Sequence, residues 1–293
     1  MQDLKAEVNS IKDEDRKNEA KVRLEKAMLT YKGEDELISS MDILEIIKNA
    51  PEEKKYMTGI KNLDKLLDGF RENQLVVLAA PTKSGKSQMT VELAIRMPKT
   101  NPVFIPFEES AEELVRKFHD VGEKPPMFYT PKQITGNNTT WIEKKVVEGI
   151  VKYNSKLFFV DHLHFIVPFS ADRLDTRIGQ VMRDLKRIAK DHGVIIVIVA
   201  HLKKTQMEVA PTLEDLRDSS FIAQEADTVL MMWRESKRVN GIMETTNNTI
   251  ISVQANRRKG KTGNVGMKFE NGRYLEYEWM MSESEAEAIY AGL

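Results

Sequence analysis

Apolar runs and amphipathic stretches alternate along the chain from residue 56 to residue 255. The compact apolar runs, rich in Val, Ile, Leu and Phe, predict strands at residues 75–79, 103–107, 157–160, 194–200, 228–233 and 249–255. The stretches between them predict helices at residues 87–97, 111–122, 141–153 and 177–192. A further strand is expected over residues 274–279.

The helix predicted at residues 177–192 shows the pattern most clearly. Its apolar side chains recur with helical periodicity and share one face, at Ile178, Val181, Met182, Leu185, Ile188 and Ala189. Strands that alternate with such helices are typical of an α/β fold. We therefore expect a mostly parallel, twisted sheet with helices on both faces.

The first 55 residues have a different pattern. A thin helical stripe of apolar residues runs through a highly charged segment, at Leu4, Val8, Ile11, Val22 and Leu29. Ser39, with Asp42 three residues later, predicts the start of a second short helix, which Pro51 ends. We interpret residues 1–55 as a helical extension and residues 56–293 as the main domain. The extension either packs on its own domain or is a linker helix that docks on a neighbouring subunit.

Composition narrows the classes of function. The 293 residues include 44 Lys and Arg against 45 Asp and Glu, a formal net charge of −1, with 41% hydrophobic residues. These proportions are those of a soluble globular protein. They disfavour a protein that coats nucleic acid through bulk positive charge, so any nucleic-acid site must be local. The chain has no cysteine, which excludes disulfides, thiolate nucleophiles and cysteine-ligated zinc.

The sequence contains neither a membrane-spanning pattern nor a secretory signal pattern. The longest apolar run, residues 194–200, is far shorter than the roughly 20 residues of a spanning helix. The first residues mix acids and bases and lack the apolar centre of a secretory signal. We therefore expect no membrane partner and a cytoplasmic location, in a bacterial cell or a virus-infected host.

A phosphate-binding loop is predicted between the strand at 75–79 and the helix at 87–97. The segment Ala80-Pro81-Thr82-Lys83-Ser84-Gly85-Lys86-Ser87 fits A-x-x-x-x-G-K-S, with Ala where the general pattern has Gly. In this context, backbone N–H groups surround nucleotide phosphates at a helix N-terminus, where the helix dipole also favours anions. Lys86 is expected to reach the β- and γ-phosphates and Ser87 to hold Mg²⁺. The loop therefore predicts ATP and Mg²⁺ as ligands.

Two acidic residues follow predicted strands. Asp161 ends the segment that begins at residue 157, and we expect it to be the Walker-B acid that holds Mg²⁺ with Ser87. Glu108 follows the strand at 103–107. Because ligand groups in open α/β sheets gather at the carboxyl ends of strands, Glu108 and Asp161 should converge on one nucleotide. Glu108 could then polarise the attacking water, although its position alone fits a first-turn helix acid equally well.

Several segments, in order, resemble the RecA-fold motor of DnaB-type hexameric replicative helicases, a group that includes phage primase-helicases and Twinkle-type helicases. They are residues 58–70, Phe107-Glu108-Glu109-Ser110, Val160-Asp161-His162-Leu163, and the run 215–234 that begins Asp215-Leu216-Arg217-Asp218-Ser219-Ser220. Ala at the first loop position is also similar to DnaB-type sequences. The resemblance covers roughly residues 57–277. It implies a RecA-like ATPase motor at residues 56–293 that forms a homo-oligomeric ring, with six subunits the expected number.

The resemblance also implies roles for single residues. The segment from Ala200 to Lys203 is similar to the element that senses the γ-phosphate, which makes His201 the sensor candidate. The loop that holds the backbone of single-stranded DNA is matched by Arg217, Asp218 and Ser220. Lys203 and Lys204 follow a strand end. In a ring they would line the pore, where the positive charges of six subunits add up.

An arginine finger is implied by residues 254–263, which resemble the element that reaches the neighbouring subunit's γ-phosphate. Matched to the phage and Twinkle pattern the finger is Arg257, and matched to the DnaB spacing it is Arg258. The family's lysine two positions earlier is replaced by Ala255 or Asn256, so a two-cation finger is not matched. Arg234, after a predicted strand, either stacks on the adenine or is a plain strand-end cation.

These features together predict a DNA helicase motor that hydrolyses ATP at subunit interfaces, moves on single-stranded DNA and unwinds duplex in replication. A primase or a helicase loader is a further expected partner. The alternative is a RecA/KaiC-like regulatory or recombination-accessory ATPase that binds DNA or partners without processive unwinding. The run 215–234 favours the helicase, whereas the unmatched lysine of the finger favours the alternative.

Overall fold

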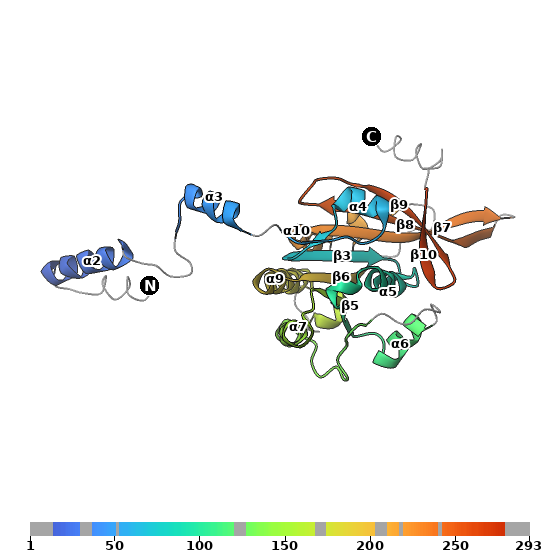
Figure 1. The fold of residues 1–293 in the computed structure, drawn as a ribbon, viewed down its shortest axis with the longest axis horizontal. Helices are drawn as coiled ribbons and strands as arrows, with labels where there is room; N and C mark the ends of the chain where they lie inside the picture. The colour runs from blue at the N-terminus through green and yellow to red at the C-terminus, as the bar shows by residue number, and fades with distance from the viewer. Residues whose placement is uncertain are drawn as a thin grey trace. The chain divides into compact units, whose positions relative to one another are not determined.

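The structure is a computed structural model that describes residues 14–29, 37–50, 53–119, 127–167, 174–202, 210–216, 219–239 and 242–278. Contacts within the chain divide it into two units, Met1–Glu52 and Glu53–Leu293. Each unit has its own architecture. In its described residues the first unit contains the helices α2 and α3, and the second unit is built around a large mixed sheet (Figure 1).

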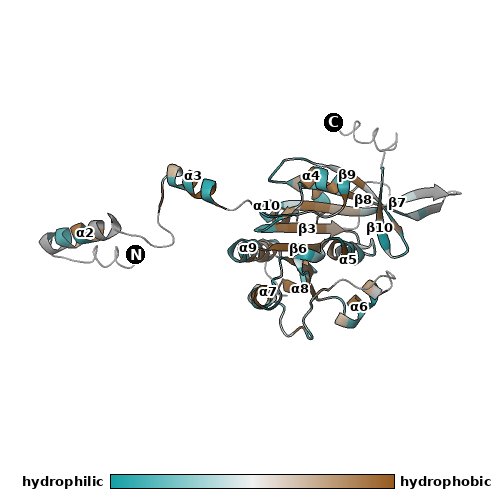
Figure 2. Ribbon diagram, viewed as in Figure 1, coloured by the Kyte–Doolittle hydropathy of each residue, from teal (hydrophilic) through white to brown (hydrophobic). Residues whose placement is uncertain are grey.

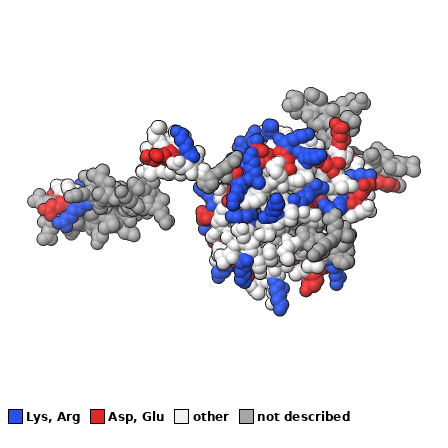
Figure 3. All heavy atoms as spheres, viewed as in Figure 1, with Lys and Arg blue, Asp and Glu red and all other residues white. Residues whose placement is uncertain are grey.

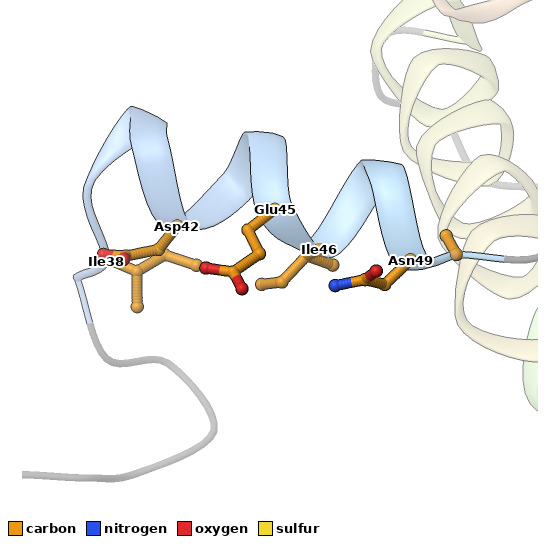
Figure 4. Close-up of a pocket in the computed structure, with 6 residues that line it drawn as sticks. Ile38, Asp42, Glu45, Ile46 and Asn49 are labelled. Carbon is orange, nitrogen blue, oxygen red and sulfur yellow. The ribbon is translucent and has the colours of Figure 1, made fainter.

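The first unit contains α2 (Glu14–Leu29) and α3 (Ser40–Asn49). The Ser39 hydroxyl accepts from the Asp42 N–H at 3.1 Å, and the Asp42 carboxylate accepts from the Ser39 N–H at 3.1 Å. This reciprocal cap confirms the helix start predicted at Ser39. None of the residues of α3 is buried. Figure 4 shows one side of this helix, where a shallow pocket is lined by Ile38, Asp42, Glu45, Ile46, Asn49 and Ala50.

An eight-stranded sheet forms the centre of the second unit, in the order β10-β9-β8-β7-β3-β6-β5-β4. The parallel part consists of β4 (Val103–Pro106), β5 (Leu157–Asp161), β6 (Ile195–His201), β3 (Gln74–Ala80) and β7 (Thr228–Val239). The antiparallel part continues from β7 through β8 (Ile242–Asn256), β9 (Gly263–Glu270) and β10 (Arg273–Tyr277). A separate two-stranded ribbon pairs β1 (Lys55–Tyr56) with β2 (Phe70–Arg71).

Helices cover both faces of this sheet. Two cores lie on opposite sides, because successive strand residues such as Val76 and Val77 point to different faces. One core packs against α4 (Lys61–Leu67), α5 (Lys86–Arg96) and α6 (Ala111–His119). The other packs against α7 (Thr139–Tyr153), α8 (Leu163–Ile166), α9 (Leu174–His192) and α10 (Ser219–Glu225). Figure 2 shows that the parallel strands are the most hydrophobic part of the eight-stranded sheet. The predicted α/β fold is confirmed.

The structure differs from the sequence predictions mainly in the antiparallel part. Strand β9 (Gly263–Glu270) was not predicted, although Val265, Met267 and Phe269 alternate with other residues at the period of a strand. The strand predicted at 228–233 continues to Val239, since β8 pairs with β7 as far as that residue. Two short 3-10 helices, η1 (Pro98–Thr100) and η2 (Leu213–Asp215), were also not predicted.

Some predictions lie outside the described residues. They include the apolar positions Leu4, Val8 and Ile11, the helix-ending Pro51, and the end of the helix predicted at 111–122. Across the ranges that the structure does describe, no helix combines the length and the apolar character that a membrane crossing requires.

Candidate functional site

The carboxyl ends of four parallel strands bring the predicted chemical groups together. Ala80 at the end of β3 is in register with His201 at the end of β6, and Pro106 at the end of β4 is in register with Asp161 at the end of β5. Glu108 follows β4 by two residues. Side chains predicted from positions far apart in the sequence therefore lie together at one edge of the sheet, as expected for open α/β sheets.

The loop between β3 and α5 has the geometry of a phosphate cradle. Strand β3 ends at Ala80 and α5 begins at Lys86, so the loop leads directly into a helix N-terminus. Gly85 has a φ of 91°, and an added Cβ would collide with the hydroxyl oxygen of Tyr274. Both facts require glycine here. The Ser84 hydroxyl donates to the Pro81 carbonyl at 2.5 Å and helps to fold the loop on itself.

Lys86 lies beneath this loop with only 6% of its surface exposed. Its ammonium group donates to the backbone carbonyls of Ala80 at 3.1 Å and Pro81 at 3.0 Å. It also lies 3.1 Å from Nδ1 of His201. Burial lowers the pKa of Lys86 to about 8, although the nearby carboxylates of Asp161 and Glu108 act in the opposite direction. Among the described residues its hydrogen-bond partners are two carbonyls and an imidazole, so this buried cation is well placed to bind an anion.

Ser87 and Asp161 form an oxygen-rich pair beside Lys86. The Ser87 hydroxyl donates to Oδ2 of Asp161 at 3.1 Å. Within the described part of the chain, Oδ1 of Asp161 is buried without a hydrogen-bond partner. Burial, followed by repulsion from Glu108, raises the pKa of Asp161 to about 6. An orphaned carboxylate oxygen next to a hydroxyl is a donor set that fits Mg²⁺, which prefers hard oxygen ligands.

Glu108 faces two histidines. Its Oε1 lies 3.1 Å from Nδ1 of His162 and 3.5 Å from Nε2 of His201. The Glu108 side chain is 40% exposed, whereas His162 is buried. The carboxylate is therefore open to solvent on one side and held by imidazole rings on the other. This position is compatible with a group that polarises water, and less so with a plain helix acid, because α6 begins only at Ala111.

His162 is the site residue that sequence reasoning missed. It follows Asp161 directly, through a cis peptide bond, and its ring lies 4.4 Å from that of His201 at an angle of 83°. Burial lowers the pKa of His162 to about 4. The signal in the sequence was the segment Asp161-His162-Leu163-His164, which places two histidines directly after a buried strand.

The predicted finger segment follows β8, and its two arginines differ. Arg258 makes a two-pronged ion pair with Glu53, in which Nη1 donates to Oε1 at 2.9 Å. Lys259 pairs with Asp68 at 3.0 Å. Arg257 is exposed, and its side chain has no ion-pair partner among the described residues. Basic and acidic side chains also lie side by side over the face of this unit that Figure 3 shows.

Of the other predicted site residues, Arg234 lies just beyond the level of Ala80 on the neighbouring strand β7, and the rest are at least partly outside the described residues. The Arg234 guanidinium donates to the Thr246 carbonyl at 3.0 and 2.7 Å, which fixes it along the β7–β8 hairpin. Ser220 belongs to α10, but its side chain lies outside the described residues. The remaining DNA-binding candidates also lie outside them, namely Lys203, Lys204, Arg217 and Asp218.

Two acids, the partly buried Asp227 and the fully buried Glu92, hold the elements around the site in place without lying in it. Asp227 accepts from the Lys186 ammonium at 2.5 Å and from the Leu75 N–H at 2.7 Å, so it fixes the start of β3. Glu92 on α5 is fully buried and binds Arg273 of β10 through two hydrogen bonds, of 2.9 and 3.1 Å. These contacts hold the strand before the loop and the helix after it in fixed positions.

The chain matches a known family over nearly all of the second unit. The family is described as DnaB-like helicase C terminal domain, and the match covers residues 56–124 and 123–278. The chain belongs to this family. The resemblance seen in the sequence is thereby confirmed, and the phosphate loop, both strand-end acids and the finger segment all lie within the matched residues.

Curated relatives of this DnaB-like chain are replicative helicases. The replicative DNA helicase DnaB of Haemophilus influenzae is 26% identical over 292 residues, which is 85% of this chain and 60% of that protein. The replicative DNA helicase DnaC of Bacillus subtilis is 24% identical over 271 residues, or 80% of this chain and 59% of that protein. The chain thus spans about three fifths of the length of these two relatives.

Solved structures share the fold of this DnaB-like chain. A DnaB-like replicative helicase, described together with its interactions with primase, has a TM-score of 0.69 at 20% identity and covers 94% of this chain and 76% of its own. A second solved structure, described as an ATPase domain, has a TM-score of 0.67 at 19% identity, with 81% and 97% covered. The RecA-like fold expected from the sequence is confirmed.

Proposed function

We propose that this chain is the ATP-hydrolysing motor of a replicative DNA helicase, which translocates on single-stranded DNA and unwinds duplex. The observation that carries the proposal is the convergence of Lys86, Ser87, Asp161 and Glu108 on one sheet edge in a DnaB-like chain. Each of these residue types matches a step of phosphoryl transfer. The two replicative DNA helicases named above as relatives support the biological context.

Nucleotide binding uses the loop and the residues beneath it. The N–H groups of residues 82–87 at the start of α5 bind the phosphates of ATP, and Lys86 exchanges the carbonyls of Ala80 and Pro81 for phosphate oxygens. Ser87 and Asp161 hold Mg²⁺, which supplies neutralisation of phosphate charge when bound. The unpaired Oδ1 of Asp161 supports this assignment, because a buried oxygen without a partner costs free energy until it is satisfied.

Hydrolysis needs a base for water and a sensor for the γ-phosphate. Glu108, open to solvent on one side, accepts the proton of the attacking water. His201 links Lys86, which binds the phosphate, to Glu108, which activates water. Glu108→Gln is expected to retain ATP binding and to lower turnover by at least about a hundredfold, measured by nucleotide binding and phosphate release. Normal turnover in this variant would return Glu108 to the role of a helix acid.

The site is completed by a neighbouring subunit in a hexameric ring. We assign the arginine finger to Arg257, because its side chain has no ion-pair partner in the described part of its own chain, whereas Arg258 is held by Glu53. A finger supplied in trans is worth roughly 10³–10⁵ in rate. Residues 1–55 act as the helical extension that grips the neighbour, and primase is a further partner, in line with the related DnaB-like helicase that is described with primase.

The decisive experiment is the ATP hydrolysis rate with and without single-stranded DNA, at protein concentrations that span assembly. The motor requires a rate that rises with both DNA and concentration, because its site lies between subunits and its pore loops hold DNA. An ATP hydrolysis rate that does not change with DNA or with protein concentration would favour a regulatory or recombination-accessory ATPase. That alternative draws support from the position two residues before the finger, where Ala255 (for Arg257) or Asn256 (for Arg258) replaces the family's lysine.

A further inference from the structure

We infer that Glu108, His162 and His201 form a binding site for a divalent transition-metal ion of the Zn²⁺ type, distinct from the Mg²⁺ site, whose occupation inhibits ATP turnover. The site itself follows from the geometry of these three side chains. Its inhibitory effect rests on the proposed function, because it depends on Glu108 acting on water.

The three side chains offer ligand atoms at nearly the spacing that a small cation requires. Oε1 of Glu108, one ring nitrogen of His162 and one of His201 all lie within 4.8 Å of one another. The two distances from Glu108 are 3.1 and 3.5 Å. In a tetrahedral Zn²⁺ site with bonds of about 2.0–2.1 Å, ligand atoms are separated by roughly 3.3 Å. The ligand groups therefore need to move closer together by at most about 1.5 Å, apart from the change at Lys86 described below.

The chemistry of the ligands distinguishes this site from the neighbouring one. Two imidazoles and one carboxylate suit Zn²⁺ and related metals, whereas Ser87 and Asp161 offer the hard oxygens that suit Mg²⁺. Three protein ligands leave a fourth position for water. Excess Mg²⁺ should consequently fill the oxygen site and leave the histidine site available.

His162 provides an independent indication of a ligand. The residue is 7% exposed, and its Nδ1 has no hydrogen-bond partner among the described residues, although it faces the Glu108 carboxylate 3.1 Å away. A buried ring nitrogen that faces a carboxylate without forming a hydrogen bond is uncommon in folded proteins. A metal ion between the two groups would satisfy both.

Lys86 sets the affinity of the site through His201. An ammonium group can only donate, so Nδ1 of His201 accepts from Lys86 and the ring proton lies on Nε2, toward Glu108. Metal binding at Nε2 requires that proton to move to Nδ1 and the ammonium group to leave. Replacing Lys86 with an uncharged side chain should therefore strengthen metal binding, even though it disables the phosphate loop.

A metal ion bound at this site prevents Glu108 from acting as the proposed base. A Glu108 carboxylate bound to a divalent ion has lost the basicity with which it would accept a proton from water. His201 is held at the same time and can no longer link Lys86 to Glu108. Zn²⁺ should therefore inhibit turnover without displacing ATP from its loop.

Co²⁺ titration of the full chain in excess Mg²⁺ tests the site directly, through the visible absorption bands that Co²⁺ gains when it leaves octahedral water for protein ligands. Wild-type protein should show saturable bands, which Zn²⁺ displaces. His162→Asn and Glu108→Gln should each weaken Co²⁺ binding by at least about tenfold, and Lys86→Met should strengthen it severalfold. Circular dichroism verifies the fold of every variant.

A second histidine–glutamate pair provides the matched control. Nε2 of His192 lies 3.0 Å from Oε1 of Glu143, on helices α9 and α7, and His192→Asn should leave the Co²⁺ titration unchanged. Absence of bands in the wild type, or bands that survive both His162→Asn and Glu108→Gln, would overturn the metal site. Bands in a protein that lacks DNA-stimulated turnover would sustain the metal site and overturn the proposed function instead. Turnover that Zn²⁺ does not reduce while it displaces Co²⁺ would overturn the inhibitory effect.

Discussion

Helices α3 and α9 have similar amphipathic sequences and opposite surroundings. On α9, Ile178, Leu185 and Ile188 are completely buried against the sheet. On α3, Ile46 is 57% exposed and Ile47 is 61% exposed, and no residue of the helix is buried. An apolar stripe thus predicts that a helix needs a partner surface, but it does not say which surface. The partner of α9 is the sheet of its own unit, whereas the described part of the first unit supplies none for α3.

Because their surroundings differ, apolar residues on α9 and on α3 contribute differently to stability. A side chain buried like Leu185 contributes about 1.5–3 kcal/mol to the stability of its own unit, whereas an exposed one contributes little until it is covered. The carboxyl edge of the sheet is a third environment, since Lys86 and Asp161 are buried there although they are polar. Substitutions in the three places should therefore affect stability, assembly and turnover separately.

The largest effect is expected at the carboxyl edge. Lys86→Ala should lower ATP turnover by about 10²–10³-fold or more, because it removes the cation that stabilises the phosphates in the transition state. Its free energy of unfolding should not fall, since burial disfavours the ammonium group more than the nearby carboxylates of Asp161 and Glu108 favour it. Phosphate release and urea unfolding provide the two measurements, with the exposed Lys99→Ala as control. Retained turnover would remove the phosphate-loop assignment.

A matched pair of truncations tests the comparison of the two helices. Leu185→Ala should lower the free energy of unfolding by about 2–5 kcal/mol, because it leaves a cavity beneath the sheet. Ile46→Ala should change it by no more than about 0.5 kcal/mol. Urea unfolding at protein concentrations below assembly measures both. Equal losses would mean that α3 is packed within its own chain as firmly as α9.

Burial of the charged Asp161 should lower the free energy of unfolding, whereas burial of an apolar side chain such as Leu185 raises it. The pKa of Asp161 is raised to about 6 from 3.8, so its favourable contribution is present below pH 3.8 and is lost as pH rises through about 6. Asp161→Asn should therefore be more stable than wild type above about pH 7, by up to about 3 kcal/mol, and similar to it near pH 4.

Asp42 on α3 provides the control for this pH dependence. Hydrogen bonds from Ser39 lower the pKa of Asp42, so its contribution is present above the unfolded pKa and is lost on acidification. Asp42→Asn should accordingly give no stabilisation at neutral pH. Urea unfolding across the pH range, with a chelator to remove divalent ions, separates the two cases. Parallel pH profiles for wild type and Asp161→Asn would contradict the assignment of a desolvated Asp161.

The smallest change is expected from one side chain on α3, and it concerns assembly. Ile46→Asp should shift the oligomer toward smaller species in light scattering, because each apolar side chain covered on docking contributes about 1.5–3 kcal/mol. Lys48→Gln changes the net charge of the same helix by the same amount and should leave the oligomer intact. A ring that survives Ile46→Asp would favour the interpretation in which the extension packs on its own domain.

The parallel core and most of the loop could be predicted from the sequence, because short-range patterns determine them. The apolar run at 194–200 predicts a strand, and the motif ending at Lys86-Ser87 predicts a phosphate loop. Each prediction needs only a few neighbouring residues. The same holds for the α/β class and the DnaB-type resemblance, which rest on the order of such runs and motifs. Strand β9 was missed although Val265, Met267 and Phe269 alternate, because Gly263 and Gly266 interrupt the run and its pairing with β8 decides its conformation.

The remaining site features depend on contacts between distant segments. His162 gains its meaning only from Glu108, which lies on a different strand end. The choice between Arg257 and Arg258 depends on Glu53, which is 205 positions before Arg258. Sequence spacing does not reveal either contact, since each joins segments that only the folded chain brings together.

The contact between Gly85 and Tyr274 links the phosphate loop to the last strand of the sheet. The Tyr274 hydroxyl donates to the Gly85 carbonyl from 189 positions further along the chain, and it occupies the space where a Cβ would stand. During synthesis on the ribosome, the loop therefore emerges long before the strand that completes its wall. The loop consequently gains its contact with Tyr274 only after almost the whole domain has been synthesised.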